Sequence, residues 1–246
     1  MYETNPKSAT IAKFLLHLGN EKIQEMSVAR QIEEIRATLP AGVTLVAVSK
    51  THPVEAIEEA YAVGQRHFGE SRPQELKAKY EALPKDIRWH MIGHLQTNKI
   101  KYIASFVALV ESVDSARLCE AIEREAVKCD RVIDILLELH VAEEETKTGW
   151  NCDELMAYVG SGAFDALPHL RVRGVMGIAS NTDDDERIRA DFGALKSAFE
   201  TLKPRFGDAF DTLSMGMSDD YPIAIACGST SVRVGSLIFG ARDYGI

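Results

Sequence analysis

The chain has 246 residues, of which 46% are hydrophobic and 26% charged, a balance typical of an ordinary globular protein. Its 28 lysine and arginine residues against 37 aspartate and glutamate residues give a net charge of −9, which disfavours binding to nucleic acid or to anionic membrane surfaces. No apolar run reaches the roughly 20 residues needed to cross a bilayer, and the chain begins without a secretion-signal pattern, so we expect a cytoplasmic protein.

The predicted elements alternate between helices and short apolar strands. Residues 8–39 carry apolar side chains every three or four positions, which predicts an N-terminal helix that Gly19 and Asn20 would interrupt. Residues 43–49 are apolar and β-branched, as in a buried parallel strand, and Pro53 starts the next helix. Seven further strands are predicted at residues 67–69, 89–92, 107–110, 133–139, 172–178, 212–215 and 232–234.

Two of the intervening helices carry clear start signals. A periodic apolar stripe from Ile188 to Leu202 follows three consecutive aspartates, whose charge favours a helix N-terminus. Asp114 is the predicted cap of the helix that carries Leu118 and Ile122. No linker rich in proline, glycine or serine divides the chain, so we expect one domain over residues 1–246.

Eight strand–helix units in about 250 residues favour a closed (β/α)8 barrel of the TIM type, with an extra N-terminal helix, over an open doubly wound sheet. In such a barrel, ligands bind at the carboxyl ends of the strands. The residues that follow each predicted strand are therefore the candidates for a functional site.

The cysteines and histidines give no sign of a metal site. Cys119, Cys129, Cys152 and Cys227 are far apart in the sequence, without neighbouring histidines, and we interpret them as buried free thiols. Two histidines lie within apolar runs, at positions 90 and 140, where a hydrogen-bonded core or strand-end histidine is the simpler interpretation.

Lys50 directly follows the first strand. If its side chain points into the barrel mouth, desolvation lowers its pKa and increases the fraction of neutral, nucleophilic amine. The alternative is a solvated lysine at the start of a loop. From this feature alone, that simpler alternative is favoured.

Small and hydroxyl residues surround the last two strands, and such residues let backbone N–H groups close around a phosphate. Many barrels of this type hold phosphate after strands seven and eight. Plain turns would explain each loop separately, and Asp219 and Asp220 disfavour an anion unless their side chains turn away. The candidates are Ser214, Gly216, Ser218, Gly228, Ser229, Thr230, Ser231, Gly235 and Ser236.

Arg233 lies within the eighth predicted strand. An unpaired guanidinium buried there would be costly, so it requires a partner or a polar mouth. A salt bridge, for instance to Glu70, is one interpretation, and contact with a ligand's ring nitrogen or phosphate is the other.

Over residues 45–244 the sequence resembles the pyridoxal 5′-phosphate homeostasis protein family, which is related to the alanine racemase barrel domain. The resemblance rests on the ordered segments AVSKTHP, HFGE, WHMIGHLQTNK, SVDS, ETKTGW, RGVMGIAS, LSMGMSDD and GSTSVRVGSLIFGARDYG. It implies that Lys50 forms a Schiff base with pyridoxal phosphate and that Arg233 contacts the pyridine nitrogen. It also implies that Ser214, Ser218, Gly235 and Ser236 surround the phosphate and that Asn98 lies near the ring edge.

Two segments depart from the family pattern. Where the family usually reads Gly-Glu-Asn-Tyr, this chain reads Gly-Glu followed by Ser71, Arg72 and Pro73, so it lacks the side chains of that Asn and Tyr. Ser236 replaces a usual threonine but keeps the hydroxyl, so phosphate binding should survive.

The resemblance implies a protein that binds the cofactor and acts in vitamin B6 homeostasis without its own turnover. An arginine at the ring nitrogen keeps that nitrogen unprotonated and weakens the electron sink that catalysis needs. The chain ends just past the barrel, so we expect no second catalytic domain and a monomer, with apo-enzymes that use the cofactor as possible recipients.

Two enzymatic alternatives remain open. One is an amino-acid racemase that takes its acid from a barrel residue such as His94 or Tyr221. The other is a lysine-dependent aldolase acting on a phosphorylated sugar, which shares the lysine and the phosphate loops.

Overall fold

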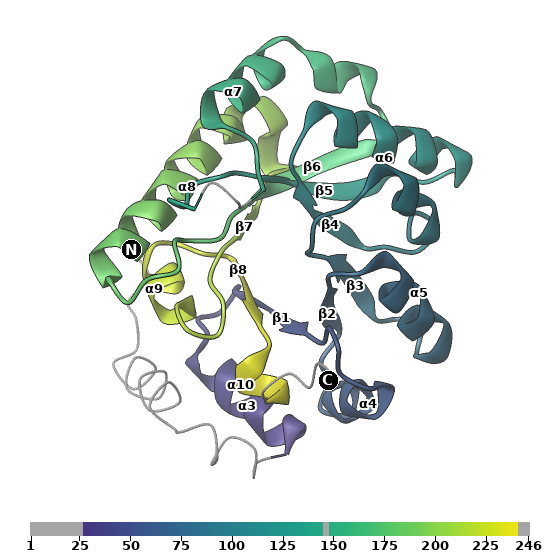
Figure 1. Cartoon of the computed structure of the whole chain (residues 1–246), viewed down its shortest axis with the longest axis vertical. Helices are drawn as coiled ribbons and strands as arrows, with labels where there is room; N and C mark the ends of the chain where they lie inside the picture. Colours follow the sequence, from purple (N-terminus) through teal and green to yellow (C-terminus); the bar gives the residue numbers. More distant parts are fainter. Residues whose placement is uncertain (1–26, 145–147, 241–246) are drawn as a thin grey trace.

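The eight predicted strands all form, and they close into a parallel barrel in chain order (Figure 1). The computed structural model describes residues 27–144 and 148–240. The strands are β1 (Thr44–Val48), β2 (His67–Glu70), β3 (Arg88–Met91), β4 (Leu109–Val113), β5 (Ile133–Glu138), β6 (Leu170–Met176), β7 (Thr212–Ser214) and β8 (Ser231–Val234). The barrel closes where β8 pairs with β1, with Val234 opposite Ala47. The predicted fold class is confirmed.

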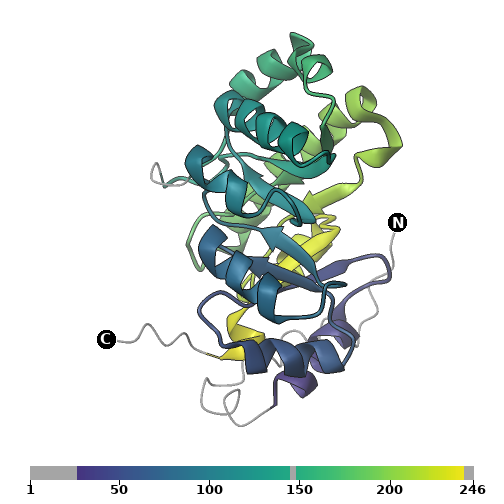
Figure 2. The same ribbon diagram turned by 90° about the vertical axis from the view of Figure 1, so that its right-hand side faces the viewer.

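Helices surround this barrel, as the two perpendicular views show (Figures 1 and 2). The α-helices are α3 (Val28–Thr38), α4 (Val54–Ala62), α5 (Pro73–Ala82), α6 (Ala116–Lys128), α7 (Cys152–Gly160), α8 (Asp185–Phe206), α9 (Tyr221–Ala226) and α10 (Ser236–Phe239). The described residues also form three 3-10 helices, η1 (Thr97–Tyr102), η2 (Ala163–Ala166) and η3 (Gly207–Ala209). In the part of the chain that the structure describes, no helix is both long and apolar enough to cross a membrane.

Helix α3 contributes to the hydrophobic core through its buried residues Ile32 and Ile35. It packs beside α4 and α10, and its Arg36 binds the carbonyl of Val63 and the side chain of Gln65, both across 2.7 Å. Helix α3 matches the end of the helix predicted over residues 8–39. The earlier part of that prediction, with Gly19 and Asn20, lies outside the described residues.

The predicted helix start after the three aspartates is confirmed, whereas the predicted cap of α6 is wrong by one residue. The Asp184 carboxylate accepts from the backbone N–H groups of Glu186 and Arg187 at the start of α8. At the start of α6, however, the Ser115 hydroxyl accepts from the Leu118 N–H at 3.3 Å. Asp114 lies one position too early for that contact, and its carboxylate instead accepts from the hydroxyl of Ser115.

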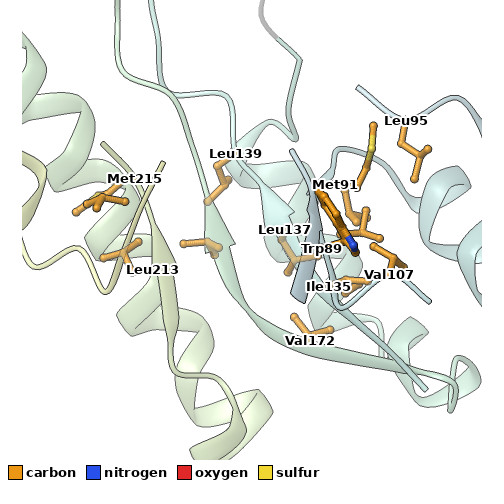
Figure 3. Close-up of a cluster of buried hydrophobic side chains, with 14 of the residues drawn as sticks. Trp89, Met91, Leu95, Val107, Ile135, Leu137, Leu139, Val172, Leu213 and Met215 are labelled. Carbon is orange, nitrogen blue, oxygen red and sulfur yellow. The ribbon is translucent and has the colours of Figure 1, made fainter. Parts of the chain in front are cut away.

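Strand residues alternate between two environments, as the strand period of two requires. One set packs outward beneath the helices, and Figure 3 shows part of it, including Trp89, Met91, Ile135 and Leu137. The other set fills the barrel interior. That interior is partly polar, because it contains the buried residues His90, Glu111 and Arg233.

The cysteines are free, as predicted, but only one of them is buried. Cys119 is buried, Cys129 and Cys227 are half-buried, and Cys152 is exposed at the start of α7. Both histidines within apolar runs have partners. The ring of His90 bonds to two side chains, and Nε2 of His140 lies 3.1 Å from the Glu144 carbonyl.

Candidate functional site

Lys50 follows β1 at the carboxyl end of the barrel and is half-buried. The next residue, Thr51, has a φ of +68°, a left-handed conformation that is strained for a β-branched side chain. A hydrogen bond from the Thr51 N–H to the Glu75 carboxylate of α5, 2.7 Å long, holds this conformation. The direction in which the chain leaves β1 after Lys50 is therefore fixed by a contact with α5.

A buried cluster of charged side chains lies between α5 and the end of β1. The ammonium of Lys79, on α5, donates to the carboxylates of Glu70 and Glu75 and to the carbonyl of Ser49, all within 2.8 Å. The Ser49 hydroxyl also donates to Glu70 at 2.6 Å. Burial raises the pKa of Glu70 to about 6 despite these bonds. The residues on both sides of Lys50 are thus held by one cationic side chain.

Arg233 points into the barrel interior and is only 4% exposed. Its Nη1 donates to the carbonyl and the hydroxyl of Ser214, at 2.9 and 2.6 Å, and its Nη2 donates to the Gly177 carbonyl at 2.9 Å. The nearest carboxylate is that of Glu111, at 3.8 Å. The predicted partner Glu70 is wrong, because Glu70 lies on the other face of β2, where it meets Lys79.

Ser218, Gly235 and Ser236 come together where β8 ends and α10 begins. The Gly235 N–H donates to the Ser218 hydroxyl across 3.2 Å. A Cβ atom at Gly235 would lie 3.2 Å from both Cβ and the carbonyl oxygen of Val48, so glycine lets the backbone approach β1 closely. This corner adjoins the end of β1, which carries Lys50.

The first residue of β8 and the residues just before it lie at the other end of the barrel. Thr230 and Ser231 border a cavity of about 360 Å³ together with first residues of other strands, such as Thr44 and His67. The hydroxyl of Ser229 donates to backbone carbonyls of β7 and β8, those of Leu213 at 3.3 Å and Ser231 at 2.9 Å. Gly228 precedes them in the same loop. The prediction that these four residues belong to the phosphate corner is therefore wrong. β8 is only four residues long, and the loops before and after it have similar glycine and serine content, so the sequence did not show which loop lies at which end.

The remaining predicted residues lie in other places. The Ser214 hydroxyl bonds to Arg233 and Glu111 in the barrel interior, which favours a role in holding Arg233. Asn98 is exposed on η1, in a pocket that also contains His94, and its place at the ring edge stays a prediction.

The two acids considered for a racemase have different positions. Tyr221 is fully buried, and its hydroxyl lies 3.2 Å from that of Thr38 in α3, so its proposed role as an acid at the mouth is wrong. His94 is exposed, with Nδ1 3.0 Å from the Asp114 carboxylate.

The Asp220 carboxylate, which was considered as a cap of the next helix, accepts instead from the Met217 N–H, at 2.5 Å.

Two buried carboxylates of the interior were not singled out from the sequence. Glu111 bonds to His90 and Ser214, and Glu138, at the end of β5, accepts from the Thr148 hydroxyl at 3.1 Å. Among the residues that the structure describes, the second oxygen of Glu138 has no hydrogen-bond partner, and burial raises the pKa of this carboxyl to about 7. A glutamate on the inward-facing positions of an apolar strand was the available signal.

Comparison with known proteins agrees with this geometry. Residues 23–243 match the family described as the alanine racemase N-terminal domain. The chain is 42% identical to the pyridoxal phosphate homeostasis protein of Aquifex aeolicus, over 81% of this chain and 87% of that protein. It is 39% identical to the protein of the same name from Pasteurella multocida, over 83% and 88% of the two chains.

Solved structures agree as well. PipY of Synechococcus elongatus, solved with pyridoxal phosphate bound, is 37% identical with a TM-score of 0.79, over 87% of this chain and 100% of that one. An alanine racemase of Streptomyces lavendulae shares the fold, with a TM-score of 0.73 at 18% identity, over 90% of this chain and 57% of that one. Fold and site thus define a lysine-bearing barrel of the alanine racemase N-terminal type. Within that class, the chain belongs to the pyridoxal phosphate homeostasis protein family.

Proposed function

We propose that this protein binds pyridoxal 5′-phosphate covalently through the Lys50 amine and acts in intracellular vitamin B6 homeostasis. The observation that carries the proposal is the arrangement on two neighbouring strands. Lys50 follows β1, Arg233 lies inside β8, and Gly235 and Ser236 follow β8 beside Ser218 of the loop after β7. Family membership and the cofactor bound in the structure of PipY support the same ligand.

The residues present fit this cofactor. A buried guanidinium suits a ring nitrogen that accepts a hydrogen bond, and a lysine amine suits an aldehyde. The glycine at position 235 lets the backbone at the end of β8 lie close to β1, and the hydroxyls of Ser218 and Ser236 can donate to phosphate oxygens. When bound, the cofactor supplies a reactive aldehyde and a ring that can accept electron density.

The chain's own residues favour holding the cofactor over catalytic turnover. A guanidinium such as that of Arg233 can donate a hydrogen bond to the ring nitrogen but is too weak an acid to protonate it. The ring then remains a weak electron sink. We therefore propose that the protein passes the cofactor to apo-enzymes that require it. We also propose that it is cytoplasmic and monomeric, with a single barrel domain over residues 1–246.

The proposal is tested by trapping the cofactor on the protein. The purified chain is mixed with pyridoxal phosphate, reduced with borohydride and mapped by peptide mass spectrometry. The adduct is expected on Lys50 and absent in Lys50→Ala, whereas Lys101→Ala, which removes an exposed lysine of η1, should label normally. An adduct elsewhere, or one undiminished in Lys50→Ala, would refute the site.

Transfer is tested separately. The loaded protein is mixed with an apo-enzyme that requires pyridoxal phosphate, and recovery of that enzyme's activity is followed with and without a scavenger of free cofactor. Recovery that the scavenger fails to suppress would support direct transfer. Incubation of the loaded protein with single L-amino acids should give no steady conversion to the D-enantiomer, and such conversion would favour the racemase alternative.

A further inference from the structure

A chain of hydrogen bonds runs through the barrel interior and ends at Arg233. Nδ1 of His67 lies 3.0 Å from Nε2 of His90, and Nδ1 of His90 lies 2.6 Å from Oε1 of Glu111. The Ser214 hydroxyl donates to Oε2 of Glu111 and accepts from Nη1 of Arg233, both at 2.6 Å. These side chains come from β2, β3, β4, β7 and β8. The chain thus connects the cavity at the amino end, which His67 borders, to the arginine beneath the mouth.

Glu111 is the central charge of this chain. It is fully buried, and burial alone would raise its pKa. The hydrogen bonds from His90 and Ser214, together with the charge of Arg233, outweigh burial and hold the pKa of Glu111 below its ordinary value. Glu111 is therefore an anion at neutral pH, and its charge offsets that of the buried Arg233.

These contacts determine which hydrogens of Arg233 can reach a ligand. A guanidinium has five N–H donors, and Arg233 uses three of them on Ser214 and Gly177. Because the Ser214 hydrogen goes to Glu111, the lone pairs of that hydroxyl are left for Nη1. The guanidinium is thereby fixed at the Nη1 side, and its remaining donors are the ones that a ring nitrogen would meet.

We propose that Glu111 is a positioning residue of the cofactor site, which sets the orientation and electrostatic environment of Arg233 through Ser214. The inference rests on the proposed function, since it requires pyridoxal phosphate over Arg233. Glu111 itself does not contact the ring in this proposal. Its effect reaches the cofactor through the contact between Arg233 and the ring nitrogen, which influences the absorption of the bound cofactor.

The test replaces Glu111 by its neutral isostere. Wild-type protein is first loaded and mapped, to establish the adduct on Lys50. In Glu111→Gln, the adduct should still form on Lys50, but its visible absorption should shift and the dissociation constant of the cofactor should rise about tenfold. Glu111→Asp, which restores the charge, should recover most of the wild-type absorption.

A second glutamate–histidine pair provides a matched control. Glu123, on α6, is also buried, with its carboxylate 2.8 Å from Nδ1 of His169 and 2.9 Å from the His169 N–H, outside the barrel interior. Glu123→Gln should lower stability without shifting the absorption of the cofactor. An equal shift of the cofactor's absorption in Glu123→Gln would overturn the proposal, because it would show that the effect of Glu111→Gln comes from general destabilisation of the protein.

Two further results would overturn the inference. Wild-type absorption and affinity in Glu111→Gln would overturn the inference and leave the proposed function intact. If Glu111→Gln does not fold, Ser214→Ala makes the same test, because it removes the hydroxyl between the carboxylate and the guanidinium. Absence of an adduct on Lys50 in the wild-type protein would overturn the proposed function and this inference with it.

Discussion

The Lys79 ammonium donates to the main-chain carbonyl of Ser49 across 2.8 Å, so a side chain of α5 holds the backbone immediately before Lys50. The same ammonium bonds to Glu75, whose carboxylate holds the strained Thr51 immediately after Lys50. Both neighbours of the candidate nucleophile thus depend on one buried cation. This arrangement favours a reactive lysine, because less conformational entropy is lost in orienting its backbone when a ligand binds.

Removing this cation should destabilise the protein strongly. In Lys79→Met, the buried carboxylate of Glu70 loses its positive partner, and we expect a loss of about 3–5 kcal/mol in the free energy of unfolding. Lys77→Met is the matched control on the same helix. Lys77 is exposed and pairs with Glu81, at 3.6 Å, so its loss should cost less than about 1 kcal/mol. Urea denaturation measures both, and equal losses would contradict a structural role for the cluster.

The phosphate corner predicts that affinity depends on the phosphate of the ligand. Ser236→Ala should weaken binding of pyridoxal phosphate by about 0.5–1.5 kcal/mol, or roughly 2- to 13-fold, and by more if the hydroxyl meets a charged oxygen. Binding of pyridoxal, which has no phosphate, should not change. Both constants are measured by absorption titration.

Thr230→Val is the control for the other end of β8. Its hydroxyl binds backbone groups near the amino-end cavity, including the Leu213 N–H at 2.8 Å. This variant should keep the wild-type ratio of the two affinities. Loss of phosphate discrimination in Thr230→Val, with none in Ser236→Ala, would move the phosphate to the amino end of the barrel.

Glu138 predicts a pH dependence of stability. Its pKa is about 7 in the folded protein and 4.5 in the unfolded chain, so between these values the folded state binds more protons. The free energy of unfolding should therefore fall as the pH rises through this range and stay lower above it. The cause is the burial of this carboxylate, whose second oxygen meets no hydrogen-bond partner within residues 27–144 and 148–240.

Glu138→Gln should remove this contribution. Relative to wild type, the variant should gain about 1–3 kcal/mol between about pH 5 and about pH 8. Glu200→Gln, which alters an exposed carboxylate of α8, should show no such gain. The difference between variant and wild type isolates Glu138 from other groups, such as Glu70 and His67, that titrate in the same region. Parallel pH profiles for Glu138→Gln and wild type would contradict the prediction.

The strands were predictable because parallel strands of a barrel are buried on both faces and so appear as short apolar runs. The position of Lys50 followed from the end of the first of these runs. The partner of Arg233 did not, because a charge in a strand shows only that some partner is required. The choice between Glu70 and Glu111 depends on which face of each strand points inward, and that depends on register within the closed sheet.

The sequence alone determined that this chain forms an eight-unit barrel with a lysine at the end of the first strand, because hydrophobic periodicity and motif order are local properties. Only the tertiary structure decided which hydroxyls lie at which end of β8 and which carboxylate faces Arg233. The Ser214–Glu111 contact joins residues 103 positions apart, and closure of the barrel is what brings them together. Contacts of that kind depend on strand order, direction and register, which no local segment specifies.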